Sequence, residues 1–232
     1  IPKFRNKIEL ENIVHSYESD NSAKILNGIN LEILHGSKIG IIGKSGSGKS
    51  TLANVVLGLL KPTEGKVLVD GKDISLNISE WTNQIGYVPQ NIYILDDTLR
   101  KNIAFGIHDK DISNSALHES IIKSQLKDFV STLPDGINTI LGERGVRISG
   151  GQLQRIGIAR ALYHNPSIII LDEATSSLDN ETEKGFMNVI NDLDTARTML
   201  IISHRLSTLE KCDKIYEISG ASIKEVKKTF IN

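Results

Sequence analysis

Residues 43–51 read Gly43-Lys44-Ser45-Gly46-Ser47-Gly48-Lys49-Ser50-Thr51. The segment fits the phosphate-loop (Walker A, or P-loop) pattern G-x-x-x-x-G-K-[ST], whose glycines let backbone N–H groups converge on phosphate oxygens. An apolar strand pattern at 37–42 precedes it, and an amphipathic helix pattern at 49–60 follows it. A strand, a glycine loop and a helix in this order predict a nucleotide phosphate site at the helix N-terminus.

Each residue type in this loop has an expected task. Lys49 neutralises the charge of the β- and γ-phosphates, and the hydroxyl of Ser50 is a ligand for Mg²⁺. The other expected contacts to the nucleotide come from Gly43, Ser45, Gly46, Ser47, Gly48 and Thr51. We expect the helix after the loop to end at Lys61-Pro62. Its buried face is predicted to carry Leu52, Val55, Val56 and Leu59.

Two acidic residues follow a second apolar strand. Ile168 to Leu171 form a buried-strand pattern, and Asp172 and Glu173 come directly after it. Open α/β sheets place ligands at the carboxyl ends of their strands. We therefore expect Asp172 to hold the Mg²⁺ shell and Glu173 to orient or deprotonate an attacking water.

A second glycine-rich helix start lies at Ser149-Gly150-Gly151-Gln152. Ser149 is a good N-cap, and the two glycines permit a close backbone approach. One nucleotide already has its loop at 43–51, so a second phosphate-binding helix start is one more than a single chain needs. Taken alone, the segment is typical of an ordinary capped helix after a turn.

On both sides of the phosphate loop, strand and helix patterns alternate along the chain. We expect a P-loop NTPase core of the α/β class with a mainly parallel sheet, an antiparallel β subdomain and a helical subdomain. Residues 1–232 are read as one domain, with 1–89 and 164–232 forming the β subdomain and core, and 90–163 the helical part. Expected strands lie at 8–17, 25–34, 67–69, 85–88, 167–171 and 198–203, and expected helices lie within 98–163 and at 181–191.

Composition is that of an ordinary globular chain. The 232 residues are 39% hydrophobic and 24% charged, with a formal net charge of -1. This balance argues against disorder, and it lacks the basic excess of a nucleic-acid binder. Cys212 is the single cysteine and is expected to be a small buried residue. No apolar run approaches the roughly 20 residues of a membrane span.

These motifs, in this order, resemble the nucleotide-binding domain of ATP-binding-cassette (ABC) transporters over about residues 8–220. Ser149 to Gln152 match the core of the family signature, with Ile148 where leucine is usual. Single-residue matches are Tyr17, Gln90, Asp179 within Ser177-Leu178-Asp179, and His204. Each is a weak signal alone, and their order carries the inference.

The resemblance implies that ATP and Mg²⁺ are held between two chains, which we expect to be identical because both half-sites look intact. Tyr17 would stack on adenine, Gln90 would reach the γ-phosphate and Mg²⁺, and His204 would act as the switch histidine. The groups implied to cap ATP on the facing chain are Ser149, Gly150, Gly151 and Gln152. Asp179 lies in the loop implied to meet that chain and is also counted among the nucleotide-binding residues. The implied catalytic groups are Lys49, Gln90, Glu173 and His204, and the implied metal ligands are Ser50, Gln90 and Asp172.

Two further segments look like those of exporters. Glu143-Arg144-Gly145 resembles a loop that touches the transmembrane helices, and residues 86–105 look most like exporters of lipids, lipid-linked glycans or peptides. We expect a motor domain at the cytoplasmic face of the cell membrane. The chain would then be a fragment, with Ile1-Pro2-Lys3-Phe4 as the tail of a connection to an N-terminally fused membrane domain.

Two other classes compete with the exporter interpretation. A soluble cassette ATPase of DNA repair usually carries a long coiled coil, and 91–148 has no sustained heptads. Translation-type relatives usually have two cassettes and basic extensions, and neither is seen. A P-loop kinase outside the cassette family would leave Ser149 to Gln152 and His204 without a task.

Overall fold

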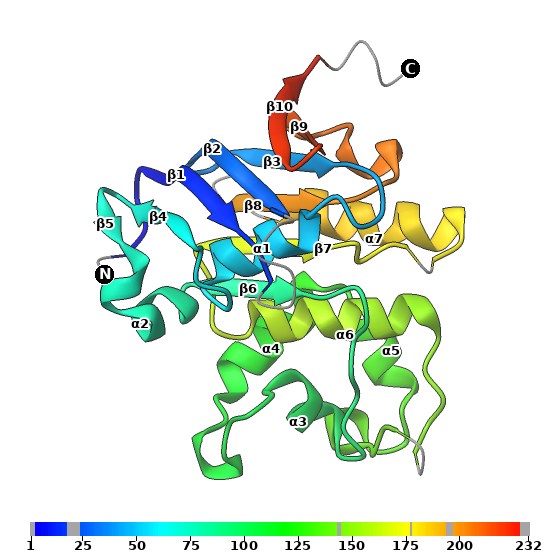
Figure 1. The fold of residues 1–232 in the computed structure, drawn as a ribbon. Coiled ribbons are helices and arrows are strands. Elements are labelled where there is room, and N and C mark those ends of the chain that lie inside the picture. Colours follow the sequence, from blue (N-terminus) through cyan, green and yellow to red (C-terminus); the bar gives the residue numbers. More distant parts are fainter. Residues whose placement is uncertain (1–2, 18–23, 143–144, 177, 194–196, 228–232) are drawn as a thin grey trace. The chain divides into compact units, whose positions relative to one another are not determined.

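The computed structural model describes residues 3–17, 24–142, 145–176, 178–193 and 197–227. The chain forms two compact units (Figure 1). The first unit comprises 1–85, 167–173 and 196–232, and the second comprises 86–166 and 174–195. The predicted helical part, 90–163, falls inside the second unit, which also takes in 174–195 from the segment expected in the core. The predicted subdomain limits remain a prediction.

An antiparallel sheet forms one part of the first unit, with strand order β2-β1-β4-β5. Its strands are β1 (Lys7–His15), β2 (Leu26–Leu34), β4 (Glu64–Val69) and β5 (Lys72–Asp73). β2 alternates buried and exposed residues along most of its length, which is the pattern of a sheet with one face in the core. The first predicted strand was expected to reach Tyr17, and it ends two residues earlier.

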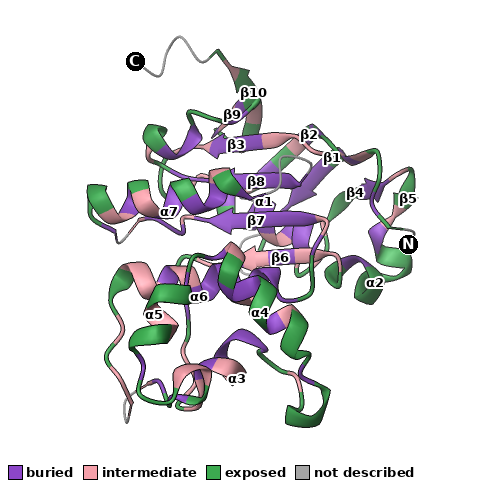
Figure 2. Cartoon of the chain, turned by 180° about the vertical axis from the view of Figure 1, so that it is seen from behind, coloured by how far each residue is buried: buried purple, intermediate pink, exposed green. Residues whose placement is uncertain are grey.

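A mainly parallel sheet forms the other part of the first unit. Its strands in this unit lie in the order β10-β9-β3-β8-β7. Their bounds are β3 (Lys38–Ile42), β7 (Ile168–Asp172), β8 (Thr198–Ile202), β9 (Lys214–Ser219) and β10 (Ser222–Val226). β3 pairs in parallel with both β8 and β9, and β7 pairs in parallel with β8. Every residue of β7 and β8 is buried (Figure 2), as expected for apolar runs in a parallel sheet.

Helix α1 (Lys49–Leu57) follows β3 and is shorter than predicted. Gly58 ends it in the left-handed conformation (φ 76°), and its N–H bonds to the Asn54 and Val55 carbonyls. Glycine adopts this conformation without strain, so it ends the helix before Lys61-Pro62. The prediction for Leu59 is therefore wrong, since this side chain lies beyond the helix and is 65% exposed.

The remaining elements of the first unit are short. They are η1 (Ile74–Leu76), α2 (Ile78–Thr82) and η4 (Leu206–Leu209). The only tryptophan, Trp81 in α2, is fully buried and donates from Nε1 to the Val56 carbonyl at 2.7 Å. Cys212 is also fully buried, as expected.

The second unit is largely helical, as predicted for 98–163. It begins with most of β6 (Ile85–Val88), and its short 3-10 turns are η2 (Asp109–Asp111) and η3 (Gly136–Asn138). Its helices are α3 (Leu99–Ile103), α4 (Asn114–Lys123), α5 (Lys127–Thr132), α6 (Gly150–Leu162) and α7 (Asn180–Asp192). Leu117, Ile121, Leu126, Ile156 and Ala159 share one apolar core, which fixes α4 against α6.

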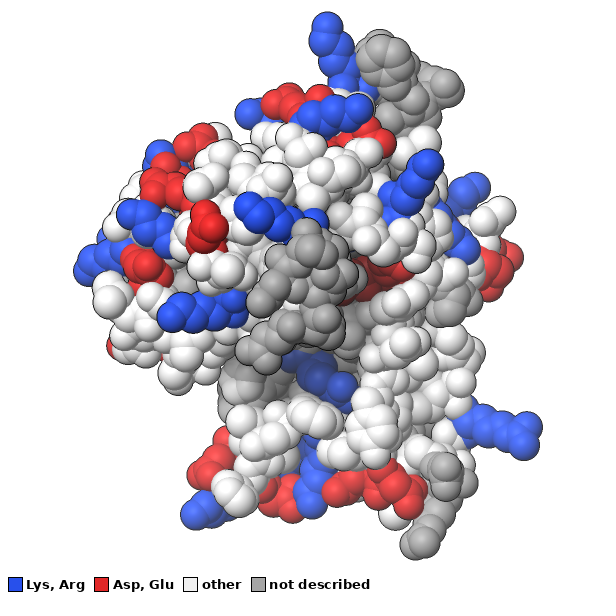
Figure 3. All heavy atoms as spheres, viewed as in Figure 1, with Lys and Arg blue, Asp and Glu red and all other residues white. Residues whose placement is uncertain are grey.

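Charged side chains of both signs are interspersed on the face of the first unit drawn in Figure 3. This agrees with the near-zero formal charge of the sequence. Among the described residues, none of the helices combines the length and the apolar character needed to cross a bilayer.

Candidate nucleotide-binding site

The predicted phosphate loop joins β3 to α1. Gly43, Gly46 and Gly48 have positive φ angles of 156°, 75° and 102°. A Cβ on Gly43 would lie 2.5 Å from Ser47 Oγ and 2.6 Å from the Ile218 carbonyl oxygen, so only glycine fits there. Ser47 Oγ is buried and has no hydrogen-bond partner among the residues that the structure describes. A buried polar atom of this kind needs a partner, and it lies where the sequence predicts phosphate.

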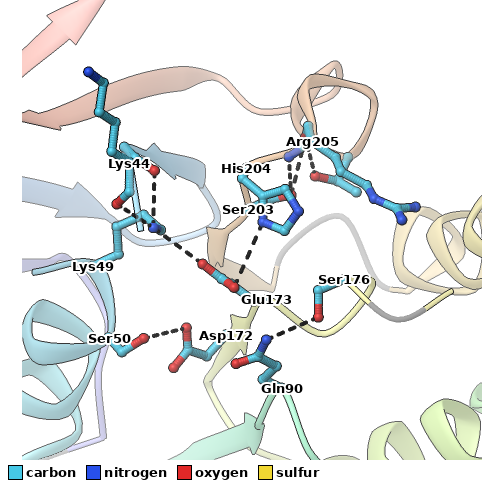
Figure 4. A network of polar contacts seen from close by, with 12 residues as sticks. Lys44, Lys49, Ser50, Gln90, Asp172, Glu173, Ser176, Ser203, His204 and Arg205 are labelled. Carbon is cyan, nitrogen blue, oxygen red and sulfur yellow. Dashed lines mark hydrogen bonds and ion pairs between the residues drawn. The ribbon is translucent and has the colours of Figure 1, made fainter. Parts of the chain in front are cut away.

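Lys49 is the first residue of α1 and is 5% exposed. Its Nζ donates to the carbonyl oxygens of Gly43 at 3.0 Å and Lys44 at 3.1 Å. The same Nζ lies 3.2 Å from Glu173 Oε1 (Figure 4). The ammonium group is therefore fixed inside the loop rather than extended into solvent.

The two acids after the buried run occupy the carboxyl end of β7. Asp172 is 6% exposed, and its Oδ1 accepts a 3.2 Å hydrogen bond from the Ser50 hydroxyl. Glu173 has a positive φ of 49°, an uncommon conformation for a residue other than glycine. Its N–H still continues the β7–β8 ladder by bonding to the Ile202 carbonyl at 2.9 Å. The turn thus begins at Glu173 and directs its carboxylate toward Lys49 (Figure 4).

His204 follows the neighbouring strand β8. Its Nδ1 lies 3.8 Å from Glu173 Oε2, and the side chain is 51% exposed. Since β3, β8 and β7 are parallel neighbours, their carboxyl ends meet at one edge of the sheet. The first unit therefore brings together the predicted residues Lys49, Ser50, Asp172, Glu173 and His204.

Tyr17 lies beside helix α1, which follows the phosphate loop. Its hydroxyl is 3.2 Å from Thr51 Oγ1, and 47% of the residue is exposed. Thr51 is buried, so its side chain anchors the tyrosine. His15 was not among the predicted site residues, and its ring packs edge-on against Tyr17 with 5.2 Å between the ring centroids. The only sequence signal for His15 is an imidazole directly after two apolar residues.

In the second unit, the predicted signature segment opens α6. Ser149 is the N-cap, and its Oγ accepts from Gln152 N at 3.2 Å. Gln152 Oε1 accepts from Ser149 N at 2.9 Å, which completes a capping box. Ser149 and Gly150 are exposed, so the helix start faces outward.

The start of α7 packs against this helix start. A Cβ on Gly151 would lie 2.7 Å from Thr182 Cγ2, so the glycine permits the contact. Asp179 caps α7 with hydrogen bonds from the N–H groups of Glu181 and Thr182 and from the Thr182 hydroxyl. The bonds from Thr182 hold the pKa of the Asp179 carboxyl below its ordinary value. Ser149, Gly151 and Gln152 also line a hollow of about 500 Å³.

Gln90 follows β6 in the second unit, where its Nε2 donates to Ser176 Oγ at 3.3 Å. The predicted residues therefore form two sets, one in each unit. Five residues named in the predictions lie outside the described part of the chain, namely Ile1, Pro2, Glu143, Arg144 and Ser177.

Known proteins resemble this chain along nearly its whole length. A sequence profile described as "ABC transporter" matches residues 26–176. A leukotoxin export ATP-binding protein, LtxB, of Aggregatibacter actinomycetemcomitans is 42% identical over 97% of this chain and 32% of its own length. An ATP-dependent lipid A-core flippase of Yersinia pestis is 38% identical over 97% of this chain and 38% of its own length.

A similar relation holds for solved structures. The structure of a bacterial Atm1-family ABC exporter with ATP bound superimposes with a TM-score of 0.85 and 36% identity. The match covers 97% of this chain and 39% of that one. The chain thus spans between 32% and 39% of the length of these relatives. None of the three is named as a DNA-repair or translation protein.

Proposed function

The chain belongs to the ABC transporter family, and on that premise we propose that it is the motor domain of an exporter, coupled to a transmembrane domain. Members of this family bind and hydrolyse ATP through this domain, so the chain is an ATPase. The observation that carries the proposal is the arrangement of Lys49, Glu173 and His204 at one sheet edge beside the phosphate loop. Export is the activity in the names of two relatives that contain such a chain.

ATP would bind with its triphosphate in the loop 43–51 and its adenine on Tyr17. The loop glycines and Ser47 supply the close backbone and hydroxyl contacts. Lys49 is already held at the loop and needs little reordering to meet phosphate oxygens. The half-exposed ring of Tyr17 offers an aromatic surface, anchored at its hydroxyl end.

The residues near Ser50 fit a magnesium ion. Mg²⁺ prefers a few oxygen ligands and keeps its remaining positions for water and phosphate. The Ser50 hydroxyl and the buried Asp172 carboxylate, 3.2 Å apart, provide two such oxygens. We include Gln90 as a third ligand on sequence grounds alone. Bound Mg²⁺ would neutralise charge on the β- and γ-phosphates.

Hydrolysis would depend on Glu173 and His204. In the proposed reaction the Glu173 carboxylate orients and polarises a water for in-line attack on the γ-phosphorus. His204, beside Glu173, steadies that arrangement and the γ-phosphate. Lys49 meets the negative charge that develops on the transferring group.

A second copy of the chain would complete each site. The exposed start of α6 presents Ser149, Gly150, Gly151 and Gln152 to the facing chain's ATP. Two-fold symmetry then gives two equal composite sites. Asp179 uses its carboxylate to cap α7, so its proposed part is to hold the loop that meets the partner.

Light scattering of Glu173→Gln, with and without MgATP, tests this function. We expect a dimer only with MgATP, because ATP stays bound between the chains when the water is not activated. Adding Lys49→Ala to this variant should abolish the dimer, and the exposed Glu64→Gln should behave as wild type. A Glu173→Gln variant that hydrolyses ATP at the wild-type rate would remove the assignment of Glu173. Membrane co-purification of the longer native protein separates an exporter from a soluble ATPase.

A further inference from the structure

A bulge in β1 turns His15 into the interior. The pairing of β1 with β2 shifts register on both sides of Ile13, and Asn12 has a positive φ of 49°. Regular strands alternate their side chains, but Ile13, Val14 and His15 are all buried. The bulge depends on Gly65, since a Cβ there would lie 2.3 Å from the Glu11 carbonyl oxygen.

The imidazole of His15 is an unusual group for this position. The residue is 7% exposed, and neither ring nitrogen has a hydrogen-bond partner in the described part of the chain. Burying polar nitrogens without partners costs free energy that an apolar ring would not cost. Such a group calls for an explanation beyond packing.

The ring of His15 contacts Tyr17. The two ring centroids are 5.2 Å apart and the planes are at 89°, a favourable edge-to-face arrangement. At its other end, Tyr17 is held by the 3.2 Å contact between its hydroxyl and Thr51 Oγ1. The tyrosine ring is thus fixed at two points while 47% of the residue stays exposed.

We propose that His15 is a positioning residue that holds the Tyr17 ring ready to stack on the nucleotide base. This rests on the proposed function, in which Tyr17 contacts adenine. His15 itself is buried and does not touch the nucleotide. A side chain that is already ordered loses less conformational entropy on binding, so His15 strengthens the binding of ligands that carry a base. It contributes nothing to the binding of phosphates alone.

The test compares two ligands in four variants of the 232-residue chain. MgADP carries a base and is not hydrolysed, whereas inorganic triphosphate with Mg²⁺ carries phosphates only. His15→Leu removes the aromatic contact and should lower the affinity for MgADP by about 2- to 12-fold, which corresponds to the free energy of an aromatic pair. His15→Phe retains an aromatic edge and should bind MgADP as wild type does. Tyr17→Ala should weaken MgADP most, and the double variant His15→Leu/Tyr17→Ala no further.

Triphosphate affinity and stability separate positioning from damage to the fold. Triphosphate should bind all four variants equally. Trp81 lies buried in the same unit, so its fluorescence during urea unfolding reports the stability of that unit. His15→Leu should be at least as stable as wild type, because it removes two unpartnered nitrogens.

Four outcomes would overturn the proposal. MgADP could bind His15→Leu as tightly as wild type, or ADP and triphosphate affinities could fall together. An additive effect of His15→Leu in the Tyr17→Ala background would show that His15 acts by another route. If Tyr17→Ala alone binds MgADP normally, the base contact in the proposed function fails, and this positioning role fails with it.

Discussion

Lys49 Nζ lies 3.2 Å from Glu173 Oε1, so the lysine proposed to bind phosphate is paired with the carboxylate proposed to activate water. Their exposed fractions are 5% and 18%, so solvent screens the pair only partly. A phosphate that approaches Lys49 must compete with this carboxylate. We therefore expect nucleotide binding to be coupled to the release of the Glu173 carboxylate from Lys49.

This pairing predicts that Glu173→Gln binds MgADP more tightly than wild type does. The amide removes both a competing anion and a source of repulsion for phosphate. The gain should be roughly 2- to 5-fold, which corresponds to about 0.4–1 kcal/mol. Calorimetric titration with MgADP measures it without turnover. Unchanged or weaker binding would show that the pair does not oppose the nucleotide.

Lys49→Ala should lose most nucleotide affinity and turnover, because no other described side chain of the loop brings a buried cation to the phosphates. Lys44→Ala is the matched control. The Lys44 side chain is exposed and points away from Lys49 (Figure 4), and only its backbone carbonyl serves the loop. Nucleotide titration and a phosphate-release assay compare the two variants. Wild-type activity in Lys49→Ala would remove the phosphate-loop assignment.

Gly151→Ala should destabilise the contact between α6 and α7. The new methyl would lie 2.7 Å from Thr182 Cγ2, and overpacking of this kind costs about 1–3 kcal/mol. Adding Thr182→Ser removes that methyl, keeps the hydroxyl for Asp179, and should restore stability. Gly150→Ala, which meets only Leu178 Cδ2 at 3.5 Å, is the control. Urea unfolding followed by circular dichroism decides between a local clash and a general intolerance of alanine.

Asp179 predicts a pH-dependent contribution to stability. The pKa of its carboxyl is below the ordinary value of 3.8 because Thr182 donates two hydrogen bonds to it. A lowered pKa stabilises the fold above pH 3.8 and loses its effect as pH falls through the lower native value. Asp179→Asn should therefore be less stable than wild type at neutral pH and approach it in acid. Urea unfolding at pH 7 and at pH 3 measures the difference in stability between Asp179→Asn and wild type. The same difference at both pH values would contradict this prediction.

Local patterns were sufficient to predict much of the fold. The strand, loop and helix at 37–60 and the acids at the carboxyl end of β7 follow from apolar periodicity and glycine spacing. Tertiary effects set the remainder. The left-handed cap at Gly58 ended α1 early, and the region 98–163 divides into short helices around a shared core. The bulge at Asn12 breaks the alternation from which strand faces are read.

The structure brings several of the predicted site residues together, but the contacts among them could not be predicted from the sequence. Lys49 and Glu173 lie far apart in sequence, and only the order of parallel strands brings them together. No local sequence pattern predicts that the buried ring nitrogens of His15 lack hydrogen-bond partners in the described part of the chain. The structure also assigns Gln152 and Asp179 to helix capping, a task that motif matching does not separate from ligand contact.

The capping box of α6 determines which substitutions of Ser149 leave the start of this helix intact. Ser149 Oγ uses a lone pair for the Gln152 N–H, and its own hydrogen is left over for an anion. Helix capping and the proposed contact with phosphate would thus use different parts of one hydroxyl. Aspartate also caps helices, yet it offers no hydrogen and adds negative charge. Ser149→Asp would thus yield an intact helix that repels phosphate, a separation-of-function allele at a single codon.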